Sequence, residues 1–321
     1  MRPTYIMRWT VMSFLFLMLL SPGLAAAQTT FGRIVVFGDS LSDPGNAFTL
    51  KGGQNTPPYD NPNKLDALLI PDVPYAMGDH HFSNGATWIE QLARTVGLAG
   101  NTRPAFQGSI TEATNYAVGG ARAHDDGVNV NLSNQVNTFL KAVGNAAPSD
   151  ALYVVEFGGN DIRDVLDTGN PAIITEALTS IGSNIGLLYS TGARKFLVWN
   201  APDLALTPAI RTLDFLYPGA AQSAGFLTQA FNSNLDGLLG LLKQELPGIE
   251  FVRLDVYQVL NGLVANPAAY GLTVVNAACI MPKLPPYECQ TPDEFLFWDG
   301  IHPTQAVHGI IAHEAASALA K

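Results

Sequence analysis

The sequence predicts an α/β protein in which a parallel sheet is covered by helices on both faces. Short apolar runs stand apart along the chain, at residues 34–37, 152–157, 196–199 and 249–252, with a weaker run at 116–118. Strands that are apolar along their whole length are typical of parallel sheets, because both of their faces are buried. Their alternation with amphipathic stretches points to the same fold class.

The amphipathic stretches predict the helices. They lie at residues 86–96, 132–143, 171–189 and 221–246. A final helix is expected to start at Pro303, a residue type favoured at the first helical position, with Val307, Ile310 and Ile311 on its inner face. The segment 46–82 is instead rich in proline and glycine. We expect a long loop there, of the kind that shapes or covers a site.

The first 27 residues have the pattern of a secretory signal peptide. Arg2 and Arg8 precede an apolar stretch, and Ala25, Ala26 and Ala27 supply a small-residue cleavage site. The apolar stretch has about 10 residues, whereas a bilayer-spanning helix needs roughly 20. We therefore predict removal of residues 1–27, export to the medium or the periplasm, and a single domain over residues 28–321. No later segment has the pattern of a membrane span, so we expect no integral membrane segment after cleavage.

The exported part of the chain is acidic. Without Arg2 and Arg8, 15 lysines and arginines stand against 27 aspartates and glutamates, a net charge of −12. Such a surface repels polyanions, which argues against a nucleic-acid partner. We expect a monomer.

Two cysteines, Cys279 and Cys289, flank a short proline-rich stretch. In an exported chain this pattern predicts a disulfide, which would hold the segment leading to Asp299 and His302. No H-E-x-x-H sequence is present, so a zinc site is not expected.

Two segments far apart in the sequence hold the residue types of an acyl-transfer site. Ser40 follows the first apolar run through Gly38 and Asp39, which places it at the carboxyl edge of the sheet, where such sheets bind ligands. Asp299 and His302 lie three positions apart in a predicted turn. Serine, histidine and aspartate supply the nucleophile, the base and the orienting carboxylate. Taken alone, Ser40 also fits a helix cap, and Asp299 and His302 also fit a surface turn.

Two more segments end predicted strands with glycine. Gly119 and Gly120 close the segment 115–121, where the absence of a Cβ lets a backbone N–H approach a ligand oxygen. Asn160 follows the run 152–157, and its amide is able to donate to a developing oxyanion. The alternative for Gly119 and Gly120 is a tight turn, and the alternative for Asn160 is a helix cap. Glu156, an acid inside an apolar run, has no partner that the sequence identifies.

Taken in order, these segments resemble the blocks of the GDSL subfamily of the SGNH hydrolases. Gly38-Asp39-Ser40-Leu41 with residues 42–46 is similar to the first block, and the segments 115–121, 159–161 and 299–303 are similar to the glycine, asparagine and aspartate–histidine blocks. Residues 81–88 resemble a stretch common in plant-type and bacterial lipase-like members. The resemblance runs from about residue 33 to 315. It implies a three-layer α/β/α sandwich with a five-stranded parallel sheet, flavodoxin-like, and no metal or organic cofactor.

The resemblance also implies roles for individual residues. Ser40 would be the nucleophile, His302 the base and Asp299 the orienting carboxylate. The oxyanion hole would consist of the Ser40 N–H, a glycine N–H and the Asn160 side chain. Counting from Asn115 favours Gly120 over Gly119 as that glycine. Further contacts to the substrate are expected from Asp39, Gly119 and His81.

The function predicted from these residues is that of a secreted serine hydrolase. It would cleave carboxylic esters, of small molecules or lipids, through an acyl-enzyme. The alternatives within the same fold are a phospholipase or lipid acyltransferase and a polysaccharide O-deacetylase. A catalytically silent binding protein would lack one of the four key residues, but Ser40, Asn160, Asp299 and His302 are all present.

Overall fold

The computed structural model describes residue 1 and residues 31–55, 67–76, 79–107, 114–282 and 286–321. Its main sheet is parallel, with the strand order β1-β2-β3-β4. The strands are β1 (Arg33–Phe37), β2 (Ala151–Val155), β3 (Lys195–Trp199) and β4 (Glu250–Leu254). The four strong apolar runs of the sequence are therefore strands, as predicted.

The weaker run at 116–118 lies beside β1 but does not form a strand. The Tyr116 N–H donates to the Val36 carbonyl at 2.8 Å, and the Val118 N–H donates to the Gly38 carbonyl at 3.1 Å. A turn follows at once, because the Ala121 N–H donates back to the Val118 carbonyl at 3.0 Å. This segment occupies the edge where a fifth strand was expected, so among the residues that the structure describes the sheet has four strands rather than five.

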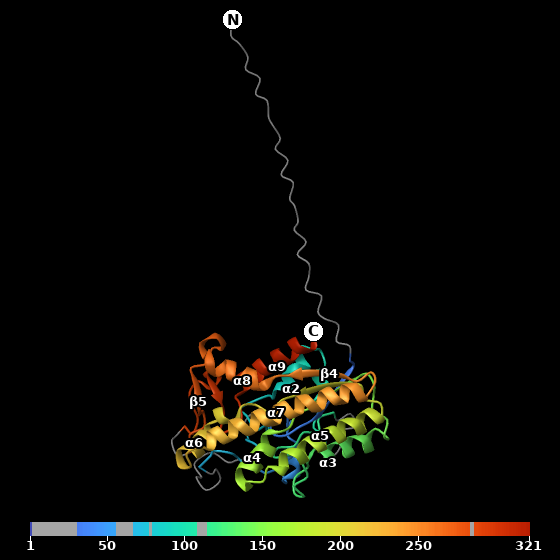
Figure 1. Cartoon of the computed structure of the whole chain (residues 1–321). Coiled ribbons are helices and arrows are strands. Elements are labelled where there is room, and N and C mark those ends of the chain that lie inside the picture. The colour runs from blue at the N-terminus through green and yellow to red at the C-terminus, as the bar shows by residue number, and fades with distance from the viewer. Residues whose placement is uncertain (2–30, 56–66, 77–78, 108–113, 283–285) are drawn as a thin grey trace.

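Side chains of the strands alternate between two cores. Ile34 and Val36 face one core, and Val35 and Phe37 face the other. The first face is covered by α2 (Trp88–Thr95), α8 (Val256–Ala265) and α9 (Gln305–Leu319). The second is covered by α3 (Leu132–Ala142), α4 (Gly159–Thr168), α5 (Ala172–Ser190) and α7 (Ala220–Glu245) (Figure 1). The result is the predicted three-layer α/β/α sandwich.

Some elements were not predicted from the sequence. Besides α4 and α8, these are α1 (Asn46–Leu50), α6 (Pro208–Leu216), β5 (Val274–Ala278) and β6 (Phe295–Phe297), the last two pairing as a small parallel sheet. Helix α1 lies where a loop was expected. It forms because the buried Asp43 carboxylate accepts the backbone N–H groups of Gly45, Asn46 and Ala47 at 2.8, 2.6 and 3.0 Å.

The final helix, α9, starts at Gln305 and not at Pro303. The Thr304 side chain caps it by accepting the Val307 N–H, while Pro303 pairs with Phe297 in an antiparallel bridge. Val307 and Ile311 are buried on its inner face, as expected.

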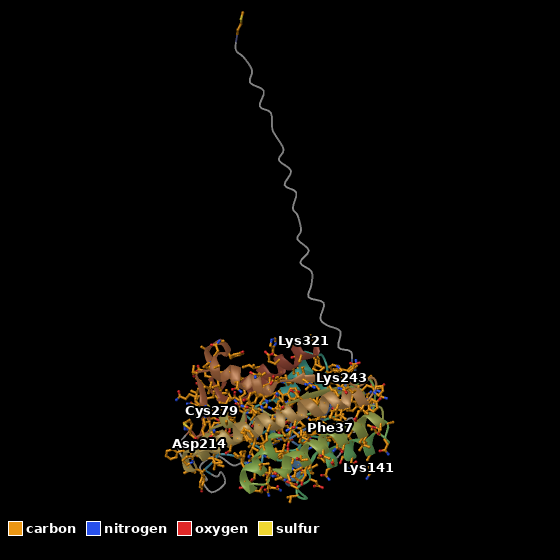
Figure 2. The ribbon with its side chains drawn as sticks, viewed as in Figure 1. Phe37, Lys141, Asp214, Lys243, Cys279 and Lys321 are labelled. Atoms are coloured by element: carbon orange, nitrogen blue, oxygen red, sulfur yellow. A yellow bond between two sulfur atoms is a disulfide. The ribbon has the colours of Figure 1, made fainter. Side chains whose placement is uncertain are left out.

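The predicted disulfide between Cys279 and Cys289 is present. Cys279 lies at the end of the molecule opposite Lys243 of α7 (Figure 2). Its N–H donates to the Phe297 carbonyl at 3.0 Å, and the next residue, Ile280, donates to the Trp298 carbonyl at 3.0 Å. The disulfide loop therefore braces the two residues that precede Asp299.

In the part of the chain that the structure describes, no helix has the length and apolar character needed to cross a bilayer. The predicted signal peptide, residues 1–27, lies outside the described residues apart from Met1.

Candidate active site

Ser40 and His302 meet across 262 positions of sequence at the carboxyl ends of the strands. The His302 Nε2 lies 2.8 Å from the Ser40 Oγ, and the His302 Nδ1 lies 2.7 Å from the Asp299 Oδ2. His302 is 4% exposed and Asp299 is fully buried. A neutral imidazole fits both contacts, with Nδ1–H donating to Asp299 and Nε2 accepting the serine hydroxyl. This geometry is able to remove the hydroxyl proton.

The Asp299 carboxylate is held by several donors. Its Oδ1 accepts the backbone N–H groups of Ile301 at 2.9 Å and His302 at 2.8 Å. Its Oδ2 also accepts the hydroxyl of Tyr75 at 2.8 Å, and this tyrosine is fully buried. Sequence reasoning missed Tyr75, because a tyrosine in a proline-rich segment carries no signal of a partner 224 positions away.

The segment that carries Tyr75 packs directly on the Asp299–His302 turn. The Gly300 N–H donates to the Leu69 carbonyl at 2.9 Å. A Cβ at Gly300 would lie 1.8 Å from the Leu68 carbonyl oxygen, so the contact requires glycine. Part of the segment 46–82 thus shapes the site, as the sequence predicted for this region.

Two backbone N–H groups near the serine are available to a ligand. Within the described ranges, neither the Ser40 N–H nor the Gly120 N–H has a hydrogen-bond acceptor. The Gly119 N–H, in contrast, donates to the Asp43 Oδ2 at 2.7 Å. Gly120 has a φ of 83°, in the left-handed region that favours glycine. Between the two glycines, Gly120 is the one whose N–H is free to bind an oxyanion.

Asn160 lies in the first turn of α4 with its amide fixed at both ends. Its Nδ2 donates to the Ala121 carbonyl at 2.9 Å and to the Asp39 Oδ2 at 3.2 Å. Its Oδ1 accepts from Arg163 at 3.0 Å, which sets the orientation of the amide. Arg163 was missed, although its i,i+3 spacing from Asn160 on a helix is the signal that could have found it.

Two of the expected substrate contacts lie elsewhere. His81 is 3% exposed and forms an ion pair with Glu90 at 2.8 Å, away from the cavity beside Ser40. Gly119 does not line that cavity, whereas Asp39 does. Of the three residues expected from the resemblance, only Asp39 lines this cavity.

Buried carboxyl groups surround the serine turn. Burial raises the pKa of Asp39 to about 6, although the Leu41 N–H and His302 oppose this shift. Burial, together with the neighbouring Asp39, raises the pKa of Glu156 well above its usual range. Glu156 thus has a partner that the sequence did not reveal: its Oε2 accepts the Asp39 N–H at 3.1 Å.

A cavity of about 60 Å³ opens beside Ser40. Asn160 and His302 line it together with the serine. Its other walls are mostly apolar. They come from the ends of β3 and β6, from α8 and α9, from the segment after β3 and from the segment before α9, with the side chains of Trp199, Pro202, Leu204, Val256, Val259, Leu260, Leu263, Phe297, Ile301, Val307 and Ile311. The serine hydroxyl therefore faces a space suited to a hydrocarbon group.

A Ser–His–Asp arrangement at the carboxyl edge of a parallel sheet is that of a serine hydrolase. The chain matches the family of GDSL-like lipases and acylhydrolases over residues 34–315, and it belongs to that family. It is an enzyme that hydrolyses esters.

Relatives with this family name are known from plants. A GDSL esterase/lipase of Arabidopsis thaliana is 28% identical over 323 residues, which cover 88% of this chain and 85% of the relative. Another from the same plant is 28% identical over 327 residues, with coverages of 89% and 88%. Among solved structures, the lipase/acylhydrolase from Enterococcus faecalis aligns with 89% of this chain and 94% of its own at 13% identity, with a TM-score of 0.39.

Proposed function

We propose that the chain is an exported esterase that hydrolyses carboxylic esters through an acyl-enzyme on Ser40. The observation that supports this most strongly is the line of contacts from the Ser40 Oγ through His302 to Asp299. His302 Nε2 takes the hydroxyl proton as the Ser40 Oγ attacks the ester carbonyl. The tetrahedral intermediate then expels the alcohol, which receives that proton. Water attacks the acyl group in the same way, with His302 again as the base.

The oxyanion forms against the N–H groups of Ser40 and Gly120 and the amide of Asn160. One such donor lowers the barrier by roughly 3 kcal/mol. The longer hydrogen bond of the Asn160 amide, 3.2 Å to Asp39, uses the proton that would be shared with the oxyanion. The shorter bond to Ala121 keeps the amide in place meanwhile.

The substrate class follows from the apolar cavity. Each buried methylene of an acyl chain contributes about 0.8 kcal/mol of binding free energy, whereas an acetyl group has only one methyl to bury. Esters with acyl groups longer than acetyl are therefore favoured over acetylated polysaccharides.

Residues 1–27 would be removed as a signal peptide on export to the medium or the periplasm, and a disulfide is consistent with that destination. Residues 28–321 would act as a single-domain monomer without a nucleic-acid partner.

Hydrolysis of p-nitrophenyl esters of increasing chain length, of phosphatidylcholine and of an acetylated glycan tests the proposal. We expect rates that rise beyond acetyl and fall by about 10⁴-fold or more in Ser40→Ala, because the nucleophile is lost. The matched control is Ser190→Ala, an exposed serine of α5, which should retain full activity. Hydrolysis that persists in folded Ser40→Ala would refute the assignment of the nucleophile, and activity on acetylated glycan alone would refute the substrate class.

A further inference from the structure

Glu156 lies directly behind the turn that carries Ser40. It follows β2, is 1% exposed, and its own N–H continues the pairing with β1 by donating to the Phe37 carbonyl at 3.0 Å. Its Oε2 accepts the N–H of Asp39, the residue before the serine. A Cβ on Gly38 would lie 2.6 Å from this oxygen, so glycine at that position admits the carboxyl group.

The Glu156 carboxyl group has two further partners, the Ser42 hydroxyl and the Asp39 carboxyl. The Ser42 Oγ is itself fixed, because it accepts the indole N–H of Trp88 at 3.0 Å. Two ionised carboxylates in contact inside a protein repel each other, so the pair retains one proton. The hydrogen bond between the two carboxyl groups raises the pKa of Glu156 and lowers that of Asp39, which favours the proton on Glu156, as the donor, and the charge on Asp39.

Asp39 connects this buried acid to the reacting groups. Its Oδ1 accepts the Leu41 N–H at 3.0 Å, which closes the turn around Ser40. Its Oδ2 accepts from the amide of Asn160. The other charged groups that act on Asp39 are His302, which favours its ionised form, and Asp161, which opposes it.

We propose that Glu156 is a positioning residue for the ester hydrolysis proposed above. As a neutral carboxylic acid it donates to the Asp39 carboxylate and accepts the Asp39 N–H. It thereby fixes the turn of Ser40 and the amide of Asn160 relative to each other. Glu156 does not line the cavity beside Ser40 and acts only through Asp39. The inference rests on the proposed function and adds a residue to its machinery.

Two substitutions at this position test the role. Glu156→Gln keeps a donor and an acceptor of the same shape, so we expect kcat within about threefold of wild type. Glu156→Leu leaves the Asp39 N–H and carboxylate without this partner, so we expect kcat to fall by about 30-fold or more at an unchanged KM. The control is Asn184→Leu in α5, a buried amide that bonds Ser133 and Ser180 away from the site. It should lower the melting temperature without lowering kcat.

The dependence of kcat on pH gives a second readout, which does not require Glu156→Leu to fold. In wild type, loss of the Glu156 proton as the pH rises puts two charges in contact and lowers kcat. Glu156→Gln cannot lose such a proton, so it should lack this decline of kcat with rising pH. Three results would overturn the role of Glu156: wild-type kcat in a folded Glu156→Leu, less than a tenth of that kcat in Glu156→Gln, or identical pH profiles. If Ser40→Ala still abolishes hydrolysis, these results leave the proposed function standing. A wild-type protein inactive on every ester would overturn the proposed function, and this inference with it.

Discussion

The ring of Phe82 fills the space that a side chain on Gly119 would need. A Cβ on Gly119 would lie 2.1 Å from the Phe82 Cε2. The same ring contacts the imidazole of His302, with centroids 5.4 Å apart and the planes tilted by 39°. Gly119 thus acts on the site through packing, because it lets the phenyl ring approach the base.

We predict that Gly119→Ala displaces Phe82 and loosens His302. The rate of ester hydrolysis should fall by about 10-fold, and the protein should lose about 1–3 kcal/mol of stability, the usual range for overpacking. Steady-state kinetics and urea unfolding measure the two effects. The control is Gly186→Ala in α5, where an added Cβ meets nothing within 4 Å. Activity in Gly119→Ala equal to that of this control would contradict the packing role.

The hydroxyl of Tyr75 gives a second prediction. Tyr75→Phe removes one donor to Asp299 but leaves the two backbone N–H groups and His302 in place. We expect kcat to fall by about 3–10-fold with KM unchanged, since the carboxylate remains bound but less well oriented. Tyr270→Phe, at an exposed tyrosine, serves as the control. No change in kcat for Tyr75→Phe would show that the backbone donors suffice.

The sequence predicted the strands of the main sheet better than those of the small sheet. Strands β1 to β3 were predictable because all or nearly all of their residues are buried and therefore apolar. Strand β5 was not, since its burial pattern has no fully buried residue and leaves no apolar run. The fifth strand was predicted by resemblance, but the turn at Ala121 ends the pairing of the segment 115–118 with β1 too early.

The sequence likewise identified some residues of the site and missed others. Ser40, His302, Asp299 and Asn160 have distinctive chemistry and neighbours, so the sequence identifies them as candidates. Tyr75 and Glu156 matter through contacts with residues more than 100 positions away, which no local pattern reports. His81 was expected near the substrate from a resembling stretch, but its side chain does not line the cavity beside Ser40.

His308 makes the fold sensitive to acid. It is fully buried, and its Nδ1 accepts the N–H of Trp88 at 3.1 Å. Burial lowers the pKa of His308 from 6.5 to about 3, with further lowering by His81 and His302 and an opposing effect of Glu90. A histidine that stays neutral in the fold but gains a proton when unfolded stabilises the protein above pH 6.5. That stabilisation is lost as the pH falls toward 3.

We therefore predict that His308→Gln, which keeps an acceptor for Trp88, flattens the pH dependence of stability. Between pH 6.5 and 4 the free energy of unfolding of wild type should include a decline of up to roughly 1.4 kcal/mol per pH unit from this group. Urea unfolding at several pH values measures it. His313→Gln, at an exposed histidine of the same helix, should leave the wild-type slope unchanged. Equal slopes in all three proteins would exclude His308 as the source.

The activation of Ser40 can be measured by its reaction with a fluorophosphonate, which phosphonylates a serine activated by a base. Mass spectrometry of the intact and digested protein should find one phosphonyl group per chain, on Ser40. Folded His302→Ala should react at least about 100-fold more slowly, because the base is lost. A wild-type protein without the adduct, an adduct on a different serine, or equal rates in the two proteins would contradict the claim that His302 activates Ser40.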